Sequence, residues 1–158
     1  MIAIGDTLPD ISLAQLTPEG MQDRGSAYFA GRTVLLFAVP GAFTPTCSEQ
    51  HLPSYLSNID KLKAAGVDAI ACVAVNDAFV MKAWSETQGC EGIDMLADGD
   101  AQFHQALGLS MDTGRFGGVR AQRYAMLVRD GEVVILQVEK PNEFSVSGAE
   151  AMLEAMAS

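Results

Sequence analysis

An apolar run at residues 33–39 leads through a short turn into a helical pattern at residues 48–65, and this pair most constrains the fold. The nearly unbroken run of apolar side chains is typical of a strand buried on both faces, as in a parallel sheet. Apolar residues recur every three or four positions in the second segment and form one helical stripe. Pro53 predicts a kink inside this helix, and Gly66 predicts its end. A buried strand followed by a helix predicts an α/β fold.

The same order of elements repeats along the next part of the chain. Residues 67–75 form a second apolar strand pattern, and Asn76-Asp77 is expected to cap a helix that ends near residue 88. A short strand at residues 93–97 and a helix at residues 98–108 follow. The order β-α-β-α-β-α predicts parallel strands joined by right-handed crossovers.

The pattern changes after the third helix. Two strand patterns, residues 123–128 and 132–138, flank the dipeptide Asp130-Gly131. Asp-Gly between two strand patterns is a strong hairpin signal. A β-α-β unit followed by a β-β-α unit is the order of a thioredoxin-like sheet. We therefore predict an α/β, thioredoxin-like fold with a central mixed sheet flanked by helices, in one domain that spans residues 1–158.

Two elements near the ends complete the prediction. Residues 11–16 alternate with period two and predict a short strand, which is followed by a turn at residues 17–20. Residues 147–157 form an amphipathic pattern that predicts the last helix. Ser147 is expected to be its N-cap, and Glu150 three positions on completes a capping box.

The charge of the chain limits its partners and its location. The formal net charge is −10, with 10 basic and 20 acidic side chains. Nucleic acids and anionic membranes would repel such a surface, so neither is expected as a partner. No apolar stretch reaches the length of a membrane span, and the start lacks the basic region of a secretory signal. We expect a cytoplasmic protein; a transit peptide already removed from this numbering is the alternative.

The three cysteines show no metal-binding pattern. Cys47, Cys72 and Cys90 form no C-x-x-C pair, and His51 and His104 do not complete a zinc spacing with them. We therefore expect no metal and no other cofactor. Sparse cysteines in a chain without a signal fit a reducing compartment.

Cys47 has a favourable position for chemistry. Thr44 is expected to be the N-cap of the following helix and Pro45 its first residue, so Cys47 falls in the first helical turn. The helix dipole there favours a thiolate over a thiol. Arg120 or Arg123, near the start of a predicted central strand, would add a cation that stays charged at any relevant pH. From this pattern alone, Cys47 is either a reactive nucleophile or a buried, inert thiol.

The segment around Cys47 closely resembles the active-site loop of peroxiredoxins, and specifically of the atypical type II group. The matching residues are Pro-Gly-Ala-Phe-Thr-Pro-Thr-Cys-Ser at positions 40–48 and His-Leu-Pro at positions 51–53. Shorter matches fall in the right order at residues 5–9, 75–81 and 123–126. The resemblance therefore extends over nearly the whole chain.

The resemblance implies a role for each residue of the loop. Cys47 would be the peroxidatic cysteine, which attacks the peroxide O–O bond and becomes a sulfenic acid. Thr44 and Arg123 would bind and polarise the two peroxide oxygens, and Pro40 would shield the thiolate from water. The pocket residues on this basis are Pro40, Gly41, Phe43 and Thr46. Gln50 stands where other branches carry a glutamate, and His51 is expected to have a structural or pocket-edge role.

The resemblance also bears on how Cys47 is reduced again. Mammalian-type members carry a resolving cysteine near the C-terminus. That mechanism is excluded here, because the matching residues 142–147 contain no cysteine. Plant-type members carry a second cysteine at the position of Cys72, which makes Cys72 a candidate resolving residue. Cys72 falls in a predicted buried strand, so a bridge to Cys47 would require the first helical turn to unwind. We therefore expect an external reductant, either glutathione with glutaredoxin or thioredoxin, with Cys72 mainly a core residue.

Several other side chains have simpler interpretations. Cys90 is expected to be a loop thiol without a catalytic role, and His104 a helix-surface residue. Arg120 is either the cation near Cys47 or only a solvated surface charge. Phe43 and Phe79 are either core residues or, as the resemblance suggests, part of a homodimer contact.

These observations favour a thiol peroxidase that reduces hydrogen peroxide and small alkyl hydroperoxides. A disulfide oxidoreductase on the same fold is disfavoured, because Cys47 has no C-x-x-C partner. A redox-sensing or chaperone-like binding protein that uses Cys47 as a switch is the alternative of a different class.

Overall fold

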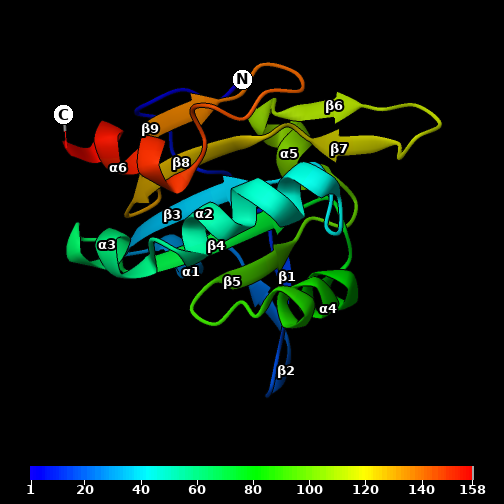
Figure 1. Ribbon diagram of the computed structural model, residues 1–158, viewed down its shortest axis with the longest axis horizontal. Coiled ribbons are helices and arrows are strands. Elements are labelled where there is room, and N and C mark those ends of the chain that lie inside the picture. Colours follow the sequence, from blue (N-terminus) through cyan, green and yellow to red (C-terminus); the bar gives the residue numbers. More distant parts are fainter. Residues whose placement is uncertain (158) are drawn as a thin grey trace.

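The computed structural model describes residues 1–157; the last residue of the predicted domain, Ser158, lies outside them. A seven-stranded mixed sheet, in the order β2-β1-β5-β4-β3-β8-β9, forms its centre, and β6 and β7 form a separate hairpin (Figure 1). The strands are β1 Leu13–Thr17, β2 Gly20–Arg24, β3 Thr33–Ala38, β4 Ala69–Ala74, β5 Asp94–Ala97, β6 Ser110–Asp112, β7 Val119–Ala121, β8 Tyr124–Arg129 and β9 Glu132–Val138. The helices are α1 Ser26–Phe29, the π-helix η1 Cys47–His51, α2 Leu52–Leu56, α3 Ile59–Ala64, α4 Ala78–Gln88, α5 Gln102–Leu107 and α6 Ala149–Ala157.

The centre of the sheet confirms the predicted α/β fold. β3 pairs in parallel with β4, and β4 with β5, while β8 runs antiparallel to β3. Every residue of β4 is buried, as the apolar run in the sequence predicts for a strand covered on both faces. The predicted hairpin is also confirmed, because β8 pairs with β9 and both Asp130 and Gly131 have positive φ angles.

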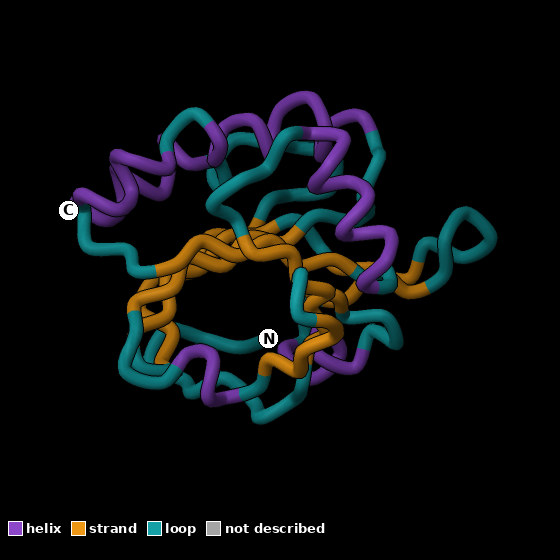
Figure 2. Tube along the Cα trace, turned by 90° about the horizontal axis from the view of Figure 1, so that it is seen from below, coloured by secondary structure: helices purple, strands orange, loops and turns teal. Residues whose placement is uncertain are grey.

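Helices cover both faces of the sheet (Figure 2). Alternate strand residues point to opposite faces, so the sheet separates two apolar clusters. One face packs against α2, α3, α4 and α6, with Tyr55, Trp84 and Met152 among the buried side chains. The other face packs against α1 and α5 through residues that include Phe29 and Phe103. Both layers are therefore closed by apolar contacts.

The predicted continuous helix at residues 48–65 is wrong. The chain instead forms η1, α2 and α3, with a break at Ser57 and Asn58. The Leu52 N–H donates to the Cys47 carbonyl in a wide π-type turn directly before Pro53. Proline has no N–H, and its ring clashes with the carbonyl four positions back, so a wider turn ahead of it relieves both problems. The kink expected at Pro53 thus appears as a π turn, and Pro53 lies in the first turn of α2.

The capping box predicted for the last helix is also wrong. The Ser147 hydroxyl donates to Glu139, not to the helix, and Glu150 accepts a hydrogen bond from Asn58. The first N–H of α6, at Ala149, donates instead to the Ser54 hydroxyl. Side chains distant in sequence therefore replace the local cap.

The expected surface position of His104 is wrong as well. Its side chain is fully buried on α5, between Asp98 and Tyr124. The helix is shorter than the predicted 98–108, because Asp98 stays outside it and accepts from the N–H groups of Phe103 and His104.

Four short elements lie outside the predictions: β2, α1, β6 and β7. The predicted strand at 11–16 is present as β1, two residues shorter at its start and one longer at its end, and the turn that follows it leads into β2.

Phe43 and Phe79 are exposed by 52 % and 66 %, so neither is a core residue. No helix within residues 1–157 is both long and apolar enough to cross a membrane.

Candidate active site

Cys47 lies just beyond the carboxyl end of β3, where the chain turns into η1, and its side chain is fully buried. Phe43 makes this turn possible with a φ of 65°, a left-handed conformation that non-glycine residues seldom adopt. Close packing favours glycine at position 41, because a Cβ there would lie 3.2 Å from the Thr44 methyl group and 3.6 Å from Arg120 Nη1. The loop is therefore closely fitted around the start of η1.

Thr44 occupies the predicted helix boundary, but its side chain does not cap the helix. The Ser48 N–H donates to the Thr44 carbonyl, while the Thr44 hydroxyl donates to the Gly41 carbonyl at 2.7 Å. This bond uses the hydroxyl proton and leaves the lone pairs of the oxygen as acceptors. Thr44 is thus prepared to accept a hydrogen bond from an O–H group.

Arg123 comes from a distant part of the sequence to the Cys47 sulfur. It directly precedes β8, and the pairing of Ala38 with Tyr124 brings it to the end of β3. Its Nη2 donates to Cys47 Sγ at 3.1 Å, and its Nη1 donates to His51 Nδ1 at 2.8 Å. The guanidinium stays charged at any relevant pH, so a fixed positive charge lies against the sulfur.

His51 holds the other arm of the guanidinium and is fully buried. Its Nε2 lies 3.0 Å from the Ser147 carbonyl oxygen, which can only accept, so this nitrogen carries the proton. Nδ1 is then the acceptor for Arg123. Burial and the nearby Arg123 charge lower the pKa of His51 to about 3, against the effect of the Ser147 carbonyl. His51 is therefore neutral and lies behind the arginine, which agrees with the structural role expected for it.

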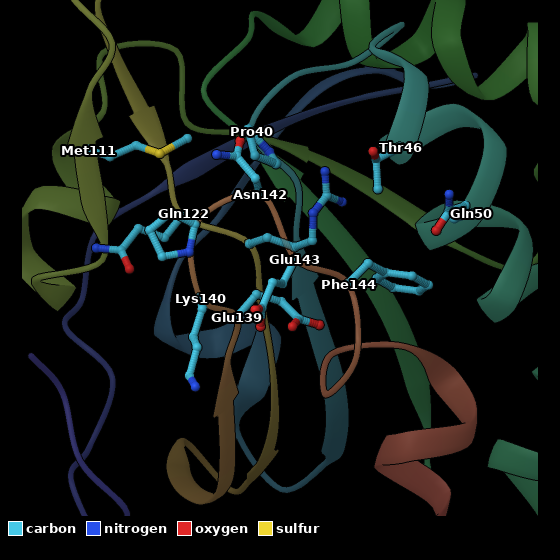
Figure 3. Close-up of a pocket in the computed structure, with 12 residues that line it drawn as sticks. Pro40, Thr46, Gln50, Met111, Gln122, Glu139, Lys140, Asn142, Glu143 and Phe144 are labelled. Carbon is cyan, nitrogen blue, oxygen red and sulfur yellow. The ribbon is translucent and has the colours of Figure 1, made fainter.

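A cavity of about 550 Å³ opens next to these groups (Figure 3). Of the residues predicted for the site, it is lined by Pro40, Thr46 and Arg123, together with Gln50. Cys47, Thr44, Gly41 and Phe43 are not among its lining residues. The loop that follows β9, residues 139–144, forms much of the opposite wall.

Arg120 does not bind the Cys47 sulfur, and its charged group is not free in solvent; it binds backbone carbonyls instead. It is half-buried, and it donates from Nε to the Gly117 carbonyl and from Nη1 to the Val75 carbonyl. It ties the β6–β7 hairpin to the end of β4 and is not a solvated charge.

The remaining cysteines lie apart from this arrangement. Cys72 is fully buried in β4 opposite Phe37, and burial raises the pKa of its thiol well above the ordinary value. Cys90 is half-buried, and burial raises the pKa of its thiol to about 11 against the effect of Ser85. All three cysteines are free thiols. Residues 1–157 contain no group of three or more His, Cys, Asp or Glu side chains placed to hold a metal ion.

Residues beyond the motif complete the site. The Ser147 carbonyl accepts from both His51 and the Tyr55 hydroxyl, and Glu139 binds the Ser147 N–H and hydroxyl. No local pattern marks the contacts of His51 and Tyr55 with Ser147, because they join residues more than 90 positions apart. Glu139 lies only 8 positions before Ser147, but no motif in the sequence singles it out. Chemically, the arrangement presents a sulfur nucleophile that faces a fixed cation beside a cavity open to small molecules.

Comparisons with known proteins agree with this chemistry. The redoxin family profile matches residues 3–153. The chain is 48 % identical to the chloroplastic peroxiredoxin-2E-2 of Oryza sativa, over 98 % of this chain and 72 % of that protein. It is 43 % identical to peroxiredoxin-2C of the same species, over 98 % of both chains.

A solved structure gives the same result at the level of the fold. Reduced Prx3 from Vibrio vulnificus, in complex with H2O2, superposes with a TM-score of 0.97 at 61 % identity, over 99 % of both chains. Family match, relatives and fold agree over nearly the whole chain. This chain therefore belongs to the redoxin family as a type II peroxiredoxin, a thiol-dependent enzyme that reduces peroxides.

Proposed function

We propose that Cys47 is the peroxidatic nucleophile of this enzyme. Its thiolate attacks the terminal oxygen of the hydroperoxide, an S–O bond forms and the O–O bond breaks. The departing oxygen takes up a proton and leaves as water or alcohol, and the cysteine becomes a sulfenic acid. The contact of Arg123 Nη2 with Cys47 Sγ at 3.1 Å carries this proposal, because it stabilises the attacking thiolate.

Thr44 and Arg123 are assigned to the two peroxide oxygens. The Thr44 oxygen has free lone pairs for the peroxide O–H, and the arginine stabilises the negative charge that develops on the leaving oxygen. Pro40 shields the sulfur from water, while Gly41, Phe43 and Thr46 shape the loop around it. These groups are fixed before the substrate arrives, which lowers the cost of reaching the transition state.

We propose hydrogen peroxide and small alkyl hydroperoxides as substrates. Hydrogen peroxide is supported by the related Prx3, which was solved with it. A cavity of about 550 Å³ is far larger than hydrogen peroxide requires, so it leaves space for an alkyl group.

An external thiol, from glutathione with glutaredoxin or from thioredoxin, is proposed to reduce the sulfenic acid. It would attack the oxidised sulfur, release water and form a mixed disulfide that a second thiol resolves. Cys72 is a poor internal alternative, because it is fully buried in β4 and its raised pKa disfavours the attacking thiolate. We place this cycle in the cytoplasm, with a removed transit peptide as the alternative.

A homodimer is the proposed assembly of the single domain at residues 1–158. Phe43 and Phe79 expose 52 % and 66 % of their surface. The Ala42 N–H donates to Asn76 Oδ1, which joins the loop of Phe43 to the segment that leads into α4. Two exposed aromatic rings, one in the loop before η1 and one in the first turn of α4, suit a contact with a second copy. A Phe79→Glu variant that sediments as a monomer would support this assembly; an unchanged sedimentation coefficient would contradict it.

Peroxide consumption with dithiothreitol tests the enzymatic proposal. We expect rapid turnover in the native protein and none in Cys47→Ser, with Cys90→Ser as the matched control that keeps it. Stoichiometric oxidation without turnover would instead favour a redox sensor.

The mass of the protein after one equivalent of peroxide tests the reductive half. A gain of one oxygen supports external reduction, whereas a loss of two hydrogens indicates an internal bridge, with Cys72 as the first candidate. Turnover that persists in Cys72→Ser with glutaredoxin would also support the external route, and complete loss would rule it out.

A further inference from the structure

Glu139 follows the last residue of β9 and is 7 % exposed, although it carries a carboxylate. One oxygen of this carboxylate, Oε2, accepts from the N–H groups of Ser145, Val146 and Ser147, each at 2.8 Å. The same oxygen accepts from the Ser147 hydroxyl at 2.7 Å. Nearly all hydrogen bonds of this carboxylate therefore converge on one short segment, residues 145–147.

This segment ends at the carbonyl that orients His51. Ser147 O accepts from His51 Nε2 at 3.0 Å and from the Tyr55 hydroxyl at 2.6 Å. A carbonyl cannot donate, so its position fixes the proton on Nε2 and leaves Nδ1 with a free lone pair. If this carbonyl moved away, the imidazole would be free to turn or to exchange its proton between the two nitrogens.

The orientation of His51 in turn determines how Arg123 meets Cys47. Arg123 Nη1 donates to His51 Nδ1 at 2.8 Å, and Nη2 of the same planar group donates to Cys47 Sγ at 3.1 Å. A guanidinium is rigid, so fixing one arm also fixes the other. Because imidazole is a neutral acceptor, it does not offset the positive charge that the sulfur meets.

We propose that Glu139 is a positioning residue of the peroxidase site. It acts through a relay of four further groups: the Ser147 carbonyl, the His51 imidazole, the Arg123 guanidinium and the Cys47 sulfur. The negative charge that holds the loop lies at the far end of this relay, whereas Gln50, in the first turn after Cys47, is uncharged. The proposal rests on the proposed role of Cys47 and extends it.

The relay is tested in the reduced protein with three variants. Glu139→Leu removes every acceptor at similar size, Glu139→Gln keeps one acceptor oxygen, and Glu132→Leu alters an exposed glutamate at the start of the same strand. The readouts are the ¹⁵N signals of His51, assigned by their absence in His51→Gln, and the rate constant for oxidation by H2O2. The single tryptophan, Trp84, reports this oxidation, because its indole donates to Ser48 directly after Cys47.

For Glu139→Leu we expect signals of both His51 tautomers and an oxidation rate lowered by up to roughly 100-fold, the cost of misplacing a catalytic group by about 1 Å. Glu139→Gln should return the single Nε2–H tautomer and most of the rate, and Glu132→Leu should match the native protein. A native rate, or a native tautomer together with a lowered rate, in Glu139→Leu would overturn the proposal.

Should Glu139→Leu fail to fold, Ser147→Ala takes its place, because it removes one of the four hydrogen bonds to Oε2. A partial loss of the Nε2–H signal with a severalfold lower rate would support the relay, and native values of both would overturn it. The tautomer is measured without peroxide. A native protein that failed to react with H2O2 would therefore contradict the proposed function while the test of the relay remained valid.

Discussion

The two histidines of this chain are both fully buried. His51 contacts Arg123 and His104 contacts Tyr124, which are neighbours in the chain at the start of β8. His51 contacts Arg123 and a backbone carbonyl, whereas His104 contacts Asp98 and the hydroxyl of Tyr124. Because adjacent strand residues point to opposite faces, the two histidines belong to different layers of the molecule. Equal burial therefore gives two different environments, one beside a cation and one beside a carboxylate.

The partners determine what each histidine contributes. Next to a guanidinium, an imidazole is useful only as a neutral acceptor, and His51 serves Arg123 in this way. Next to a carboxylate, an imidazole completes a structural network that joins α5 to β8 through Tyr124. Burial opposes the charge of Asp98, but the hydrogen bonds from His104 and Phe103 outweigh it and lower its pKa. The cation side supports reactivity, and the carboxylate side supports stability.

The largest effect that would separate the two environments is the pH dependence of stability. The pKa of His51 is about 3 in the folded protein and 6.5 in the unfolded chain, so the unfolded chain binds the extra proton first as the pH falls. Stability from His51 is therefore complete above pH 6.5 and is lost as the pH falls toward 3, by up to about 5 kcal/mol. Urea unfolding at a series of pH values measures this.

The interval from pH 6.5 to 4.5 separates His51 from the carboxyl groups with lowered pKa values, which are Asp10, Asp98 and Glu139, because these groups titrate below it. In this interval His51→Gln should flatten the decline in the free energy of unfolding. A decline of the native size in His51→Gln would show that another group is responsible.

On the carboxylate side, Asp98→Ala is expected to lower the free energy of unfolding by about 3–5 kcal/mol. The change leaves His104 without its carboxylate and two buried N–H groups, at Phe103 and His104, without an acceptor. The peroxide rate of the protein that remains folded should stay close to native, since Asp98 does not reach Cys47. Urea unfolding and the oxidation rate constant give the two values, and a rate that fell more than tenfold would contradict the separation.

On the cation side, Arg123→Met should lower the rate of reaction with peroxide and change the free energy of unfolding much less. Loss of a donor that stabilises developing charge costs about 100- to 1000-fold in rate, or roughly 2.7–4 kcal/mol. Arg129→Met, at the exposed end of the same strand, is the matched control. The single-turnover rate with H2O2 is the measurement, and equal rates in the two variants would remove Arg123 from the chemistry.

The contrast also explains how much could be predicted from the sequence. The β8–β9 hairpin and the buried run of β3 follow from local patterns, because an Asp-Gly turn and an apolar run are visible within a few residues. The meeting of Arg123 with Cys47 was predicted from a motif and is present at 3.1 Å. These features depend on contacts that a pattern or a family motif contains.

Features that depend on distant partners could not be predicted in this way. Ser147 has the local pattern of a helix cap, yet Glu139 offers its hydroxyl a charged acceptor. His104 has the pattern of an exposed helical residue, yet Tyr124, 20 positions on, binds its ring from β8. In both cases a tertiary hydrogen bond outweighs the local preference.

The smallest effect is expected where the reactive side meets the core. Trp84 is fully buried and donates to the Ser48 hydroxyl at 2.9 Å, which ties η1 to α4. Ser48→Ala leaves this indole N–H without its acceptor and should lower stability by about 1–3 kcal/mol.

The Cys47 side chain is fully buried, so a bulky reagent can reach it only when η1 opens. A loss of even 1 kcal/mol in η1 should therefore raise the rate of maleimide labelling at Cys47 roughly fivefold. Oxidation by H2O2 should change much less, because a peroxide enters without opening η1. Equal acceleration of both reactions would mean that η1 opens for peroxide as well as for maleimide, and the region around Arg123 and Cys47 would then be mobile and not rigid.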